Sequence, residues 1–580
     1  MSPTPPNQGN ASGSDAVAKY ERLANDMVSV YATGDALAMQ RINQHYGRAS
    51  TVDDLRAIVW RLVYKVRQAK GAAHAFQLPE AQELIARTTG FPNWGALTQS
   101  AARGIPSPLP PYLVDAKEDR ISLSRQVADR EWDTIIAVMK ERSLTGLDGN
   151  GFLTDDALKR IAELPLVTRL GLGGSRGVSD DGLQLLAQMP QLQRLDLSEY
   201  PGGKLTDRGL EVLRHLPNLR SFEMTWQRGI SDTGVANLKF CENLERVNLM
   251  GSPTGDGAIE ALRGKPRLRR FSTGKLVTDA GLPLLHDFPL LKTWQGELPV
   301  PGGGEFSGGA HLLIDGPFTN NGLASLAGLA GVWELDLFWH VLGITSAGFA
   351  HLLYLPNLGS LGCDGKLSDN EAMGHIAALP RLRNLRAQES IASDEGFVAL
   401  SKSKSLESLW GRECPNFGSR GFVALSKMPA LRGLGIGCRN VDDQALSTLP
   451  QFPALRELTP IRVKDAGFRH IGQCQSLERL TCMYCRDTTD AATEHIGGLS
   501  NLKYYYAGLT QITDRSLEIL SRIASLEVVD LFETKGITDA GLAFLRNLPG
   551  LREVNLSGLP NITLAGTKIF PPQVRVNYEV

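Results

Sequence analysis

The pair Cys482 and Cys485, separated by two residues, is the strongest candidate in this chain for a reactive or metal-binding site. A Cys-x-x-Cys pair can act as a redox-active dithiol or supply half of the ligands of a zinc ion. A four-cysteine zinc site needs a second pair, and the sequence has seven cysteines but no second Cys-x-x-Cys. We therefore expect both thiols to be structural, and the sequence predicts no metal site and no cofactor.

The histidines and the glycine-rich stretch do not combine into a catalytic motif. P-loop and His-Glu-x-x-His motifs are absent, and the stretch GGGEFSGG lacks the strand-to-helix context of a dinucleotide-binding loop. The ten histidines are scattered along the chain, at His45, His74, His215, His286, His311, His340, His351, His375, His470 and His495. The sequence therefore predicts that the protein is not an enzyme.

The charge balance and the start of the chain bear on partners and location. The 580 residues include 61 basic and 62 acidic side chains, a net charge of −1. Nucleic-acid binding needs a basic surface that displaces counterions, so we expect no nucleic-acid partner. The start, MSPTPPNQGNASGSD, lacks the basic and apolar regions of a signal peptide. No apolar run approaches the length of a membrane span, which is about 18 to 20 residues. The sequence thus predicts a cytoplasmic protein with no membrane contact.

One phrase recurs through the last three quarters of the chain. It joins a Thr/Ser-Asp pair and x-Gly-Leu-x-x-Leu to Leu-Pro-x-Leu-x-x-Leu-x-Leu, as in VSDDGLQLLAQMPQLQRLDL and ITDAGLAFLRNLPGLREVNL. The second residue of the pair recurs at a nearly constant interval, except for one long gap between Asp279 and Asn320. Self-similarity at such a period is typical of a solenoid.

Each half of the repeat has a physical interpretation. The Thr or Ser is a good N-cap, and the Asp that follows lies in the first helical turn, where the helix dipole favours a carboxylate. Apolar residues at helical spacing come next, and a proline such as Pro190 or Pro217 ends the helix. The closing Leu-x-x-Leu-x-Leu alternates like a strand that is buried on one face.

With this motif the chain resembles the leucine-rich-repeat family, in its cysteine-containing subclass found in F-box proteins and bacterial relatives. The resemblance covers Leu153 to Asn577 and implies a surface for interaction. We place the solenoid at residues 151–577, as an α/β fold with a parallel inner sheet and outer helices. Strands pair at about 4.8 Å and helices pack at about 8 to 10 Å, so the stack must curve into a horseshoe or superhelix.

The long gap between Asp279 and Asn320 predicts an irregular insertion at about residues 296–310. It has two strand-like pieces, Leu290–Gln295 and His311–Asp315, and between them the Gly- and Pro-rich PVPGGGEFSGG. One interpretation is a degenerate repeat whose helix became a loop. The other is a flexible flap beside the binding surface.

The segment before the repeats divides into four parts. We expect a disordered tail at 1–14, a helical module at 15–104, a Pro-rich linker at 105–117 and a capping helix at 118–150. The module resembles the helical segment that precedes repeat arrays in bacterial proteins, through Gly90, Phe91, Trp94 and Leu97. We expect these aromatic residues to fill a small helical core, with partner docking as the alternative.

Large side chains at outward positions of the predicted strands suggest a binding surface. Outward strand positions are usually polar, and exposed aromatic residues reduce solubility unless they contact a partner. We expect a protein or peptide to bind this concave face; the alternative is that the aromatic rings stack between repeats as a structural ladder. The candidate residues are Trp226, Phe338, Trp339, Trp410, Arg412, Met483, Tyr484, Tyr504, Tyr506 and Phe532.

The sequence therefore predicts a non-enzymatic interaction scaffold of bacterial type. One alternative is a ubiquitin-ligase substrate receptor, since Leu78-Pro79-Glu80 is similar to the start of an F-box, although the run expected after it is missing. The other is a secreted bacterial effector.

Overall fold

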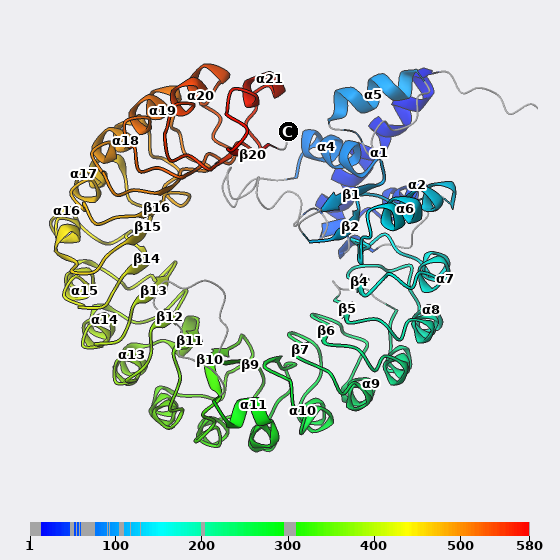
Figure 1. Ribbon diagram of the computed structural model, residues 1–580, viewed down its shortest axis with the longest axis horizontal. Coiled ribbons are helices and arrows are strands. Elements are labelled where there is room, and N and C mark those ends of the chain that lie inside the picture. The colour runs from blue at the N-terminus through cyan, green and yellow to red at the C-terminus, as the bar shows by residue number, and fades with distance from the viewer. Residues whose placement is uncertain are drawn as a thin grey trace, which may run out of the picture. The chain divides into compact units, whose positions relative to one another are not determined.

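The structure is a computed structural model, and the chain forms two compact units, Met1–Lys275 and Leu276–Val580. The residues that it describes are 13–46, 51–53, 55–56, 59, 76–89, 91, 93–103, 110–115, 118–127, 129–198, 204–294 and 309–578. Unit 1 holds a group of helices followed by strands β1 to β8, and unit 2 holds strands β9 to β20 (Figure 1).

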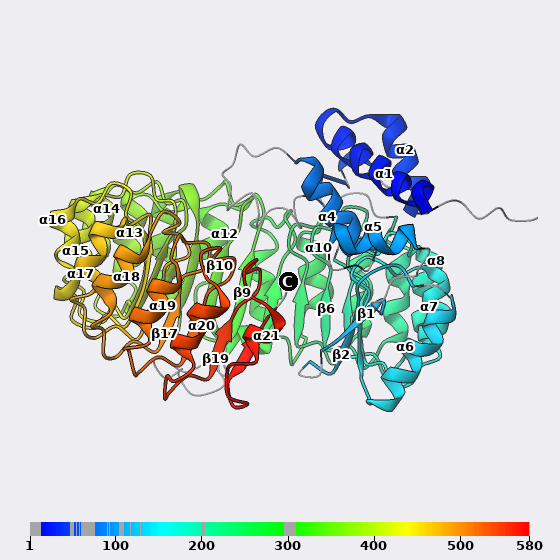
Figure 2. The same cartoon turned by 90° about the horizontal axis from the view of Figure 1, so that it is seen from above.

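The first helices of unit 1 pack on one another around their own core (Figure 2). They are α1 (Gly13–Thr33), α2 (Ala36–Tyr46), α4 (Leu78–Thr88) and α5 (Trp94–Ala102). Phe91 and Leu97 are buried in this core and Trp94 packs against it, as the sequence predicted. Residues 1–12 of the expected tail and Gly90 lie outside the described residues, and α1 already begins at Gly13.

The segment expected to be a Pro-rich linker and one capping helix is built differently. β1 (Tyr112–Asp115) pairs antiparallel with β2 (Arg120–Leu123), and α6 (Asp129–Glu141) and β3 (Gly146–Asp148) follow. The prediction of a single helix over 118–150 is therefore wrong. Ile121 and Leu123 alternate with less buried neighbours, which is a strand pattern, and β2 pairs with β3. The β1–β2 hairpin thus covers the first edge of the parallel sheet, which would otherwise have free backbone groups.

The repeats of unit 1 alternate short helices with three-residue strands, where η denotes a 3-10 helix. In chain order they are α7 (Asp155–Ala162), β4 (Arg169–Gly171), α8 (Asp180–Gln184), η1 (Leu185–Gln188), β5 (Arg194–Asp196), η2 (Gly209–His215), β6 (Ser221–Glu223), α9 (Asp232–Val235), η3 (Ala236–Phe240), β7 (Arg246–Asn248), α10 (Asp256–Leu262) and β8 (Arg270–Ser272). From β2 to β8 each strand pairs in parallel with the next.

Unit 2 continues the same plan. Its first half is η4 (Leu282–Asp287), α11 (Pro289–Lys292), β9 (Ala310–Ile314), α12 (Asn320–Ala324), β10 (Val332–Leu337), η5 (Ser346–Tyr354), β11 (Ser360–Cys363), η6 (Gly365–Leu367), α13 (Asn370–Ala377), β12 (Asn384–Arg386), α14 (Asp394–Leu400) and β13 (Ser408–Gly411). Its second half is α15 (Ser419–Leu425), β14 (Gly433–Gly437), α16 (Asp443–Leu446), η7 (Leu449–Gln451), β15 (Glu457–Ile461), η8 (Asp465–Gly467), α17 (Phe468–Ile471), β16 (Arg479–Thr481), α18 (Asp490–Ile496), β17 (Tyr504–Tyr506), α19 (Asp514–Leu520), β18 (Val528–Asp530), α20 (Asp539–Leu545), β19 (Glu553–Asn555), α21 (Leu564–Thr567) and β20 (Arg575–Asn577).

The long gap in the repeat pattern contains one element that the sequence did not predict. Pro289–Lys292 forms helix α11, so the strand expected at Leu290–Gln295 is wrong, because Pro289 starts a helical turn that buries Leu291. The strand expected at His311–Asp315 is present as β9. Residues 295–308, which carry most of the predicted insertion at 296–310, lie outside the described residues.

The helix starts follow the predicted capping chemistry and add a link between repeats. Thr154, Ser179 and Thr538 each accept a backbone N–H of their own first turn. Each Asp of the Thr/Ser-Asp pair was expected to act on its own helix. In addition, Asp514 accepts both the backbone N–H and the hydroxyl of Thr538 in the next repeat, at 2.8 and 2.6 Å. The recurring Asp therefore joins neighbouring repeats.

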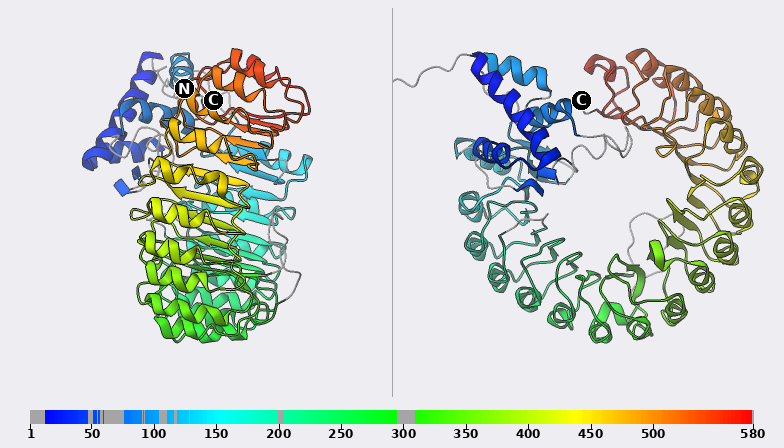
Figure 3. Two further views of the ribbon diagram at one scale, coloured as in Figure 1. Left: turned by 90° about the vertical axis from the view of Figure 1, so that its left-hand side faces the viewer. Right: turned by 180° about the vertical axis from the view of Figure 1, so that it is seen from behind.

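In each unit the repeats form a curved α/β solenoid of the leucine-rich-repeat fold. The strands lie on the inner side of the curve and the helices on the outer side (Figure 1). The helices of unit 2 stack side by side in chain order (Figure 3, left, green to yellow). Leu409, Tyr505 and Val529 are buried at the centre of their strands, between neighbours that are less buried. The open side of the strands is called the concave face below. Within the described residues, no helix is both long and apolar enough to cross a bilayer.

Candidate functional site

The cysteines occupy buried positions without the chemistry of a reactive thiol. All seven are free and buried. The Cys485 Sγ donates to the carbonyl oxygen of Pro460 in the preceding repeat, at 2.7 Å. Burial raises the pKa of the Cys485 and Cys438 thiols to about 12 and that of Cys414 to about 11. A thiol with such a pKa is not a nucleophile at neutral pH, so these contacts agree with the structural role that we expected.

A serine motif that the sequence analysis missed is also buried. Residues 173–177 read Gly-Gly-Ser-Arg-Gly, which fits the Gly-x-Ser-x-Gly pattern of hydrolase nucleophiles. Ser175 lies in the turn after β4, and its Oγ accepts the backbone N–H of Leu153 at 3.4 Å. A nucleophile of this class is exposed at the end of a strand, and Ser175 is not.

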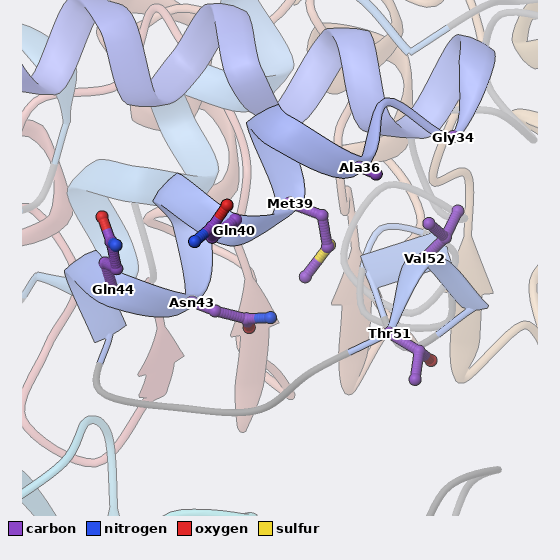
Figure 4. Close-up of a pocket in the computed structure, with 8 residues that line it drawn as sticks. All are labelled: Gly34, Ala36, Met39, Gln40, Asn43, Gln44, Thr51 and Val52. Carbon is purple, nitrogen blue, oxygen red and sulfur yellow. The ribbon is translucent and has the colours of Figure 1, made fainter.

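A pocket of about 670 Å³ lies beside α2 in the helical part of unit 1 (Figure 4). Its described lining is Gly34, Ala36, Met39, Gln40, Asn43, Gln44, Thr51 and Val52. Among these residues there is no carboxylate, histidine, cysteine or lysine, so the described lining offers no general acid, base or strong nucleophile.

The predicted partner-binding residues are all at least partly accessible, on strands or in the turns that follow them. Trp410, Tyr504 and Tyr506 lie on strands, and none of the three is fully buried. The other candidates lie just beyond the ends of β6, β10, β13, β16 and β18; they are Trp226, Phe338, Trp339, Arg412, Met483, Tyr484 and Phe532. Trp226 belongs to unit 1 and the rest to unit 2. Because the strands of each unit are parallel, these turns lie along one edge of each concave face.

Trp410 covers a glycine on the neighbouring strand. Trp410 of β13 and Gly435 of β14 are register partners, and a Cβ at Gly435 would lie 2.3 Å from the Trp410 ring. The glycines of β14, at positions 433, 435 and 437, could leave a bare groove on the sheet. At Gly435 there is none, because the indole occupies the space that the missing side chain leaves.

Trp410, Arg412 and Tyr484 converge from strands that are not neighbours. The rings of Trp410 and Tyr484 have centroids 6.1 Å apart. The Arg412 guanidinium lies over the Tyr484 ring, 6.0 Å from its centroid. Within the described part of the chain, the buried Nε of Arg412 has no hydrogen-bond partner. We call these three residues the Trp410 cluster.

The tyrosines of β17 are held differently. The guanidinium of Arg479, the register partner of Tyr504, stacks on its ring at 4.0 Å from the centroid. Burial raises the pKa of Tyr506, and the nearby groups of Asp530, Tyr504 and Tyr484 add to this effect. This stack joins two neighbouring repeats through a guanidinium and one ring, whereas the alternative left open in the sequence was a ladder of aromatic rings.

Phe338 and Trp339 form an exposed aromatic pair after β10. Their rings stack with centroids 5.0 Å apart and an interplanar angle of 8°, and Trp339 is 67% exposed. In unit 1, Trp226 lies against Gly251 of the next repeat, where an added Cβ would be 2.4 Å from its ring. Trp226 therefore resembles Trp410 in its packing.

A charged network on the concave face was not predicted as a unit. His311 of β9 contacts Asp336 of β10 at 3.0 Å, and Arg386 of β12 binds Asp336 at 2.6 Å and Asp364 at 3.0 Å. Burial alone would raise the pKa of Asp336, but His311 and Arg386 outweigh it and lower that pKa. The four charged residues of this network come from different repeats of the solenoid. An alignment of the repeats that places His311 beside Glu334 would have predicted that His311 lies close to these carboxylates.

The comparisons with known proteins find only distant similarity to solved structures. No family model and no curated protein matches the sequence. Similar solved structures include an internalin of Listeria monocytogenes, with 16% identity and a TM-score of 0.33, over 59% of this chain and 82% of the internalin. A leucine-rich-repeat protein of Leptospira interrogans matches at 16% identity and a TM-score of 0.34, over 72% and 97%. A chain of the yeast Rad7–Elc1 complex matches at 14% and 0.31, over 91% and 98%. Values this low transfer no function.

Proposed function

We propose that the protein is a non-enzymatic scaffold whose unit 2 binds a protein or peptide on the concave face, centred on the Trp410 cluster. The observation that carries the proposal is Arg412, which stacks on Tyr484 while its buried Nε lacks a hydrogen-bond partner among the described residues. A buried donor without a partner is unfavourable, and a ligand acceptor that draws the Arg412 guanidinium out of this position relieves the cost.

The composition of the cluster suits a folded or peptide partner. Trp, Tyr and Arg are the residue types that contribute most to binding at protein interfaces. A planar guanidinium that is already positioned by stacking can bind a carboxylate with two hydrogen bonds. We therefore propose that the partner presents an Asp, a Glu or a terminal carboxylate to Arg412 and apolar side chains to Trp410. Met483, Tyr504, Tyr506 and Phe532 extend the surface.

Arg412→Ala, alone and combined with Trp410→Ala, tests the proposal. We expect a protein captured by the wild-type chain from an extract of its source organism to be lost with the double variant, and its affinity to fall about tenfold or more with Arg412→Ala alone. The melting temperature should change little for Arg412→Ala, because no described side chain forms an ion pair with this arginine. Capture is followed by mass spectrometry and affinity by calorimetry.

The matched control removes an aromatic residue and an arginine from the outer side. Phe544 on α20 is 41% exposed and Arg546 follows the end of this helix. Phe544→Ala with Arg546→Ala should leave capture intact. Loss of the partner with this control but not with the double variant at 410 and 412 would place binding on the helices and contradict the proposal. A captured nucleic acid would contradict the class of partner.

Two narrower roles make their own predictions within the scaffold proposal. A ubiquitin-ligase substrate receptor requires the segment 50–100 to bind a Skp1-like adaptor. However, Leu78-Pro79-Glu80 opens α4, where Glu80 accepts the backbone N–H of Gln77, so capping alone accounts for this motif. A secreted effector requires an export signal in the segment 1–50. We favour a cytoplasmic scaffold, and an adaptor-binding assay and a secretion assay distinguish the three.

A further inference from the structure

Two adjacent strands of unit 2 bring one imidazole and two carboxylates to the same face. His311 of β9 and Glu334 of β10 are register partners in a parallel pair. Asp336 lies two residues after Glu334 on the same strand, so both side chains point to the same side of the sheet. The backbone therefore sets the spacing of the three groups, and no loop has to fold to assemble them.

The distances between the three side chains are close to those of a metal site. The His311 Nε2 lies 3.0 Å from the Asp336 Oδ2, and the Nδ1 lies 3.8 Å from the Glu334 Oε2. One potential ligand atom from each residue falls within 4.8 Å of the others. Zinc binds His nitrogen and carboxylate oxygen at about 2.0 to 2.2 Å in tetrahedral geometry, which puts neighbouring ligands about 3.3 to 3.6 Å apart. An imidazole binds one metal ion through one of its nitrogens, so Glu334, whose side chain is 37% exposed, would turn from the Nδ1 toward the Nε2, which faces Asp336.

The surroundings orient Asp336 and leave access to the site. Arg386 binds the Asp336 Oδ1 and leaves the Oδ2, which faces His311. The arginine reaches across β11 because position 362 is glycine; a Cβ there would lie 1.9 Å from the Asp336 Oδ1 and 2.3 Å from the Arg386 Nη2. Such outer contacts commonly hold metal-binding carboxylates in place. The side chain of His311 is 29% exposed, so water can reach the remaining coordination positions.

The charges also favour a divalent cation. Glu334 and Asp336 carry two negative charges side by side, while Arg386 is shared between Asp336 and Asp364. A divalent ion would neutralise the two carboxylates that face His311. The imidazole and carboxylate ligand types suit zinc and its first-row neighbours better than calcium or magnesium, which prefer oxygen ligands alone.

We infer that His311, Glu334 and Asp336 form a zinc-binding site on the concave face of unit 2, with Arg386 as a positioning residue for Asp336. The site is independent of the Trp410 cluster and of the proposed partner.

The test is a zinc titration of the full-length, tag-free chain after treatment with a chelator. Calorimetry should show one Zn²⁺ bound per chain at this site, and Co²⁺ substituted for zinc should give the visible absorption of a low-coordinate site with mixed N and O ligands. His311→Ala and Glu334→Gln should each weaken binding at this site about 100-fold. Circular dichroism checks that both variants fold; both changed side chains are partly exposed, and Glu334→Gln keeps the side-chain size.

The matched control is His375→Ala. His375 contacts Glu371 at 3.8 Å on α13. Among the described residues, this His–carboxylate pair is not part of a group of three possible metal ligands. This variant should bind Zn²⁺ like the wild type. The inference is overturned if the wild-type chain binds no Zn²⁺ at micromolar concentrations, or if His311→Ala and Glu334→Gln bind it as tightly as the wild type.

Discussion

At the residue scale, the glycine before the helix leucine makes room for a carboxylate of the preceding repeat. At Gly541 an added Cβ would lie 2.1 Å from the Asp514 Oδ1, and at Gly182 it would lie 1.8 Å from the Asp155 Oδ1. The same carboxylates bind the N-cap residue of the repeat that carries the glycine. In these two repeats the glycine therefore accommodates the close approach of a neighbouring carboxylate.

Other repeats meet the same demand without glycine: in one of them Ala492 takes this position while Asp465 binds the N-cap Thr489. In another the residue is serine. Ser516 occupies the equivalent position after Asp514, and its hydroxyl donates to the Asp490 Oδ1 at 2.6 Å. The hydroxyl converts a steric conflict into a hydrogen bond. The sequence shows serine at position 516, where the repeat phrase has glycine. It does not show the hydrogen bond that the serine makes, because the Asp490 carboxylate belongs to the preceding repeat.

Gly541→Ala should therefore lower the free energy of unfolding by about 1 to 3 kcal/mol, because the methyl group displaces the Asp514 carboxylate. Gly374→Ala is the control: it is also a helix position, but a Cβ there has no described atom within 4 Å, so alanine should be neutral or slightly stabilising. Urea denaturation followed by circular dichroism measures both. Equal stabilities for the two variants would refute the steric explanation.

At the element scale, the sequence predicted where the helices begin but not whether each is an α-helix or a 3-10 helix. The Thr/Ser-Asp pair marks helix starts at Asp155, Asp180 and Asp539, as expected. However, η2 and η5 are 3-10 helices, whose tighter winding fits a short repeat. The β1–β2 hairpin was missed because its function, pairing with the open edge of the sheet, depends on a strand that comes later in the chain.

The carboxylates that join the repeats predict a loss of stability in acid. Burial alone would raise the pKa of Asp490, but hydrogen bonds from Ser516 and Thr513 outweigh it and lower that pKa below its usual value. A group whose pKa is lowered by folding stabilises the fold above its unfolded pKa, about 3.9 for Asp, and this contribution is lost as the pH falls through the folded pKa.

Asp490→Asn should therefore be less stable than the wild type at pH 7 by about 1 kcal/mol, and the difference should shrink as the pH falls below about 4. Asn370 shows that an amide can take this position, since it accepts the backbone N–H of Ser393 at 2.8 Å. Urea denaturation at a series of pH values measures the effect. A difference that stays constant from pH 7 to pH 3 would exclude a role for the charge of Asp490.

At the scale of the whole molecule, the repeat period predicted the solenoid, whereas the candidate site was predictable only in part. The accessible side of the strands was assigned correctly for Tyr504 and Tyr506, because burial alternates along β17. Contacts between distant strands, such as Trp410 with Tyr484, depend on side chains that cross several repeats. A repeat pattern read one unit at a time does not contain them.

The measurement that tests the central claim most directly is photo-crosslinking from the concave face of unit 2. A benzoylphenylalanine that replaces Tyr506 should crosslink to the captured partner, whereas the same group in place of Phe544 on α20 should not. Crosslinks from position 544 with none from position 506 would mean that the partner binds the helices and that the Trp410 cluster is part of the structural framework.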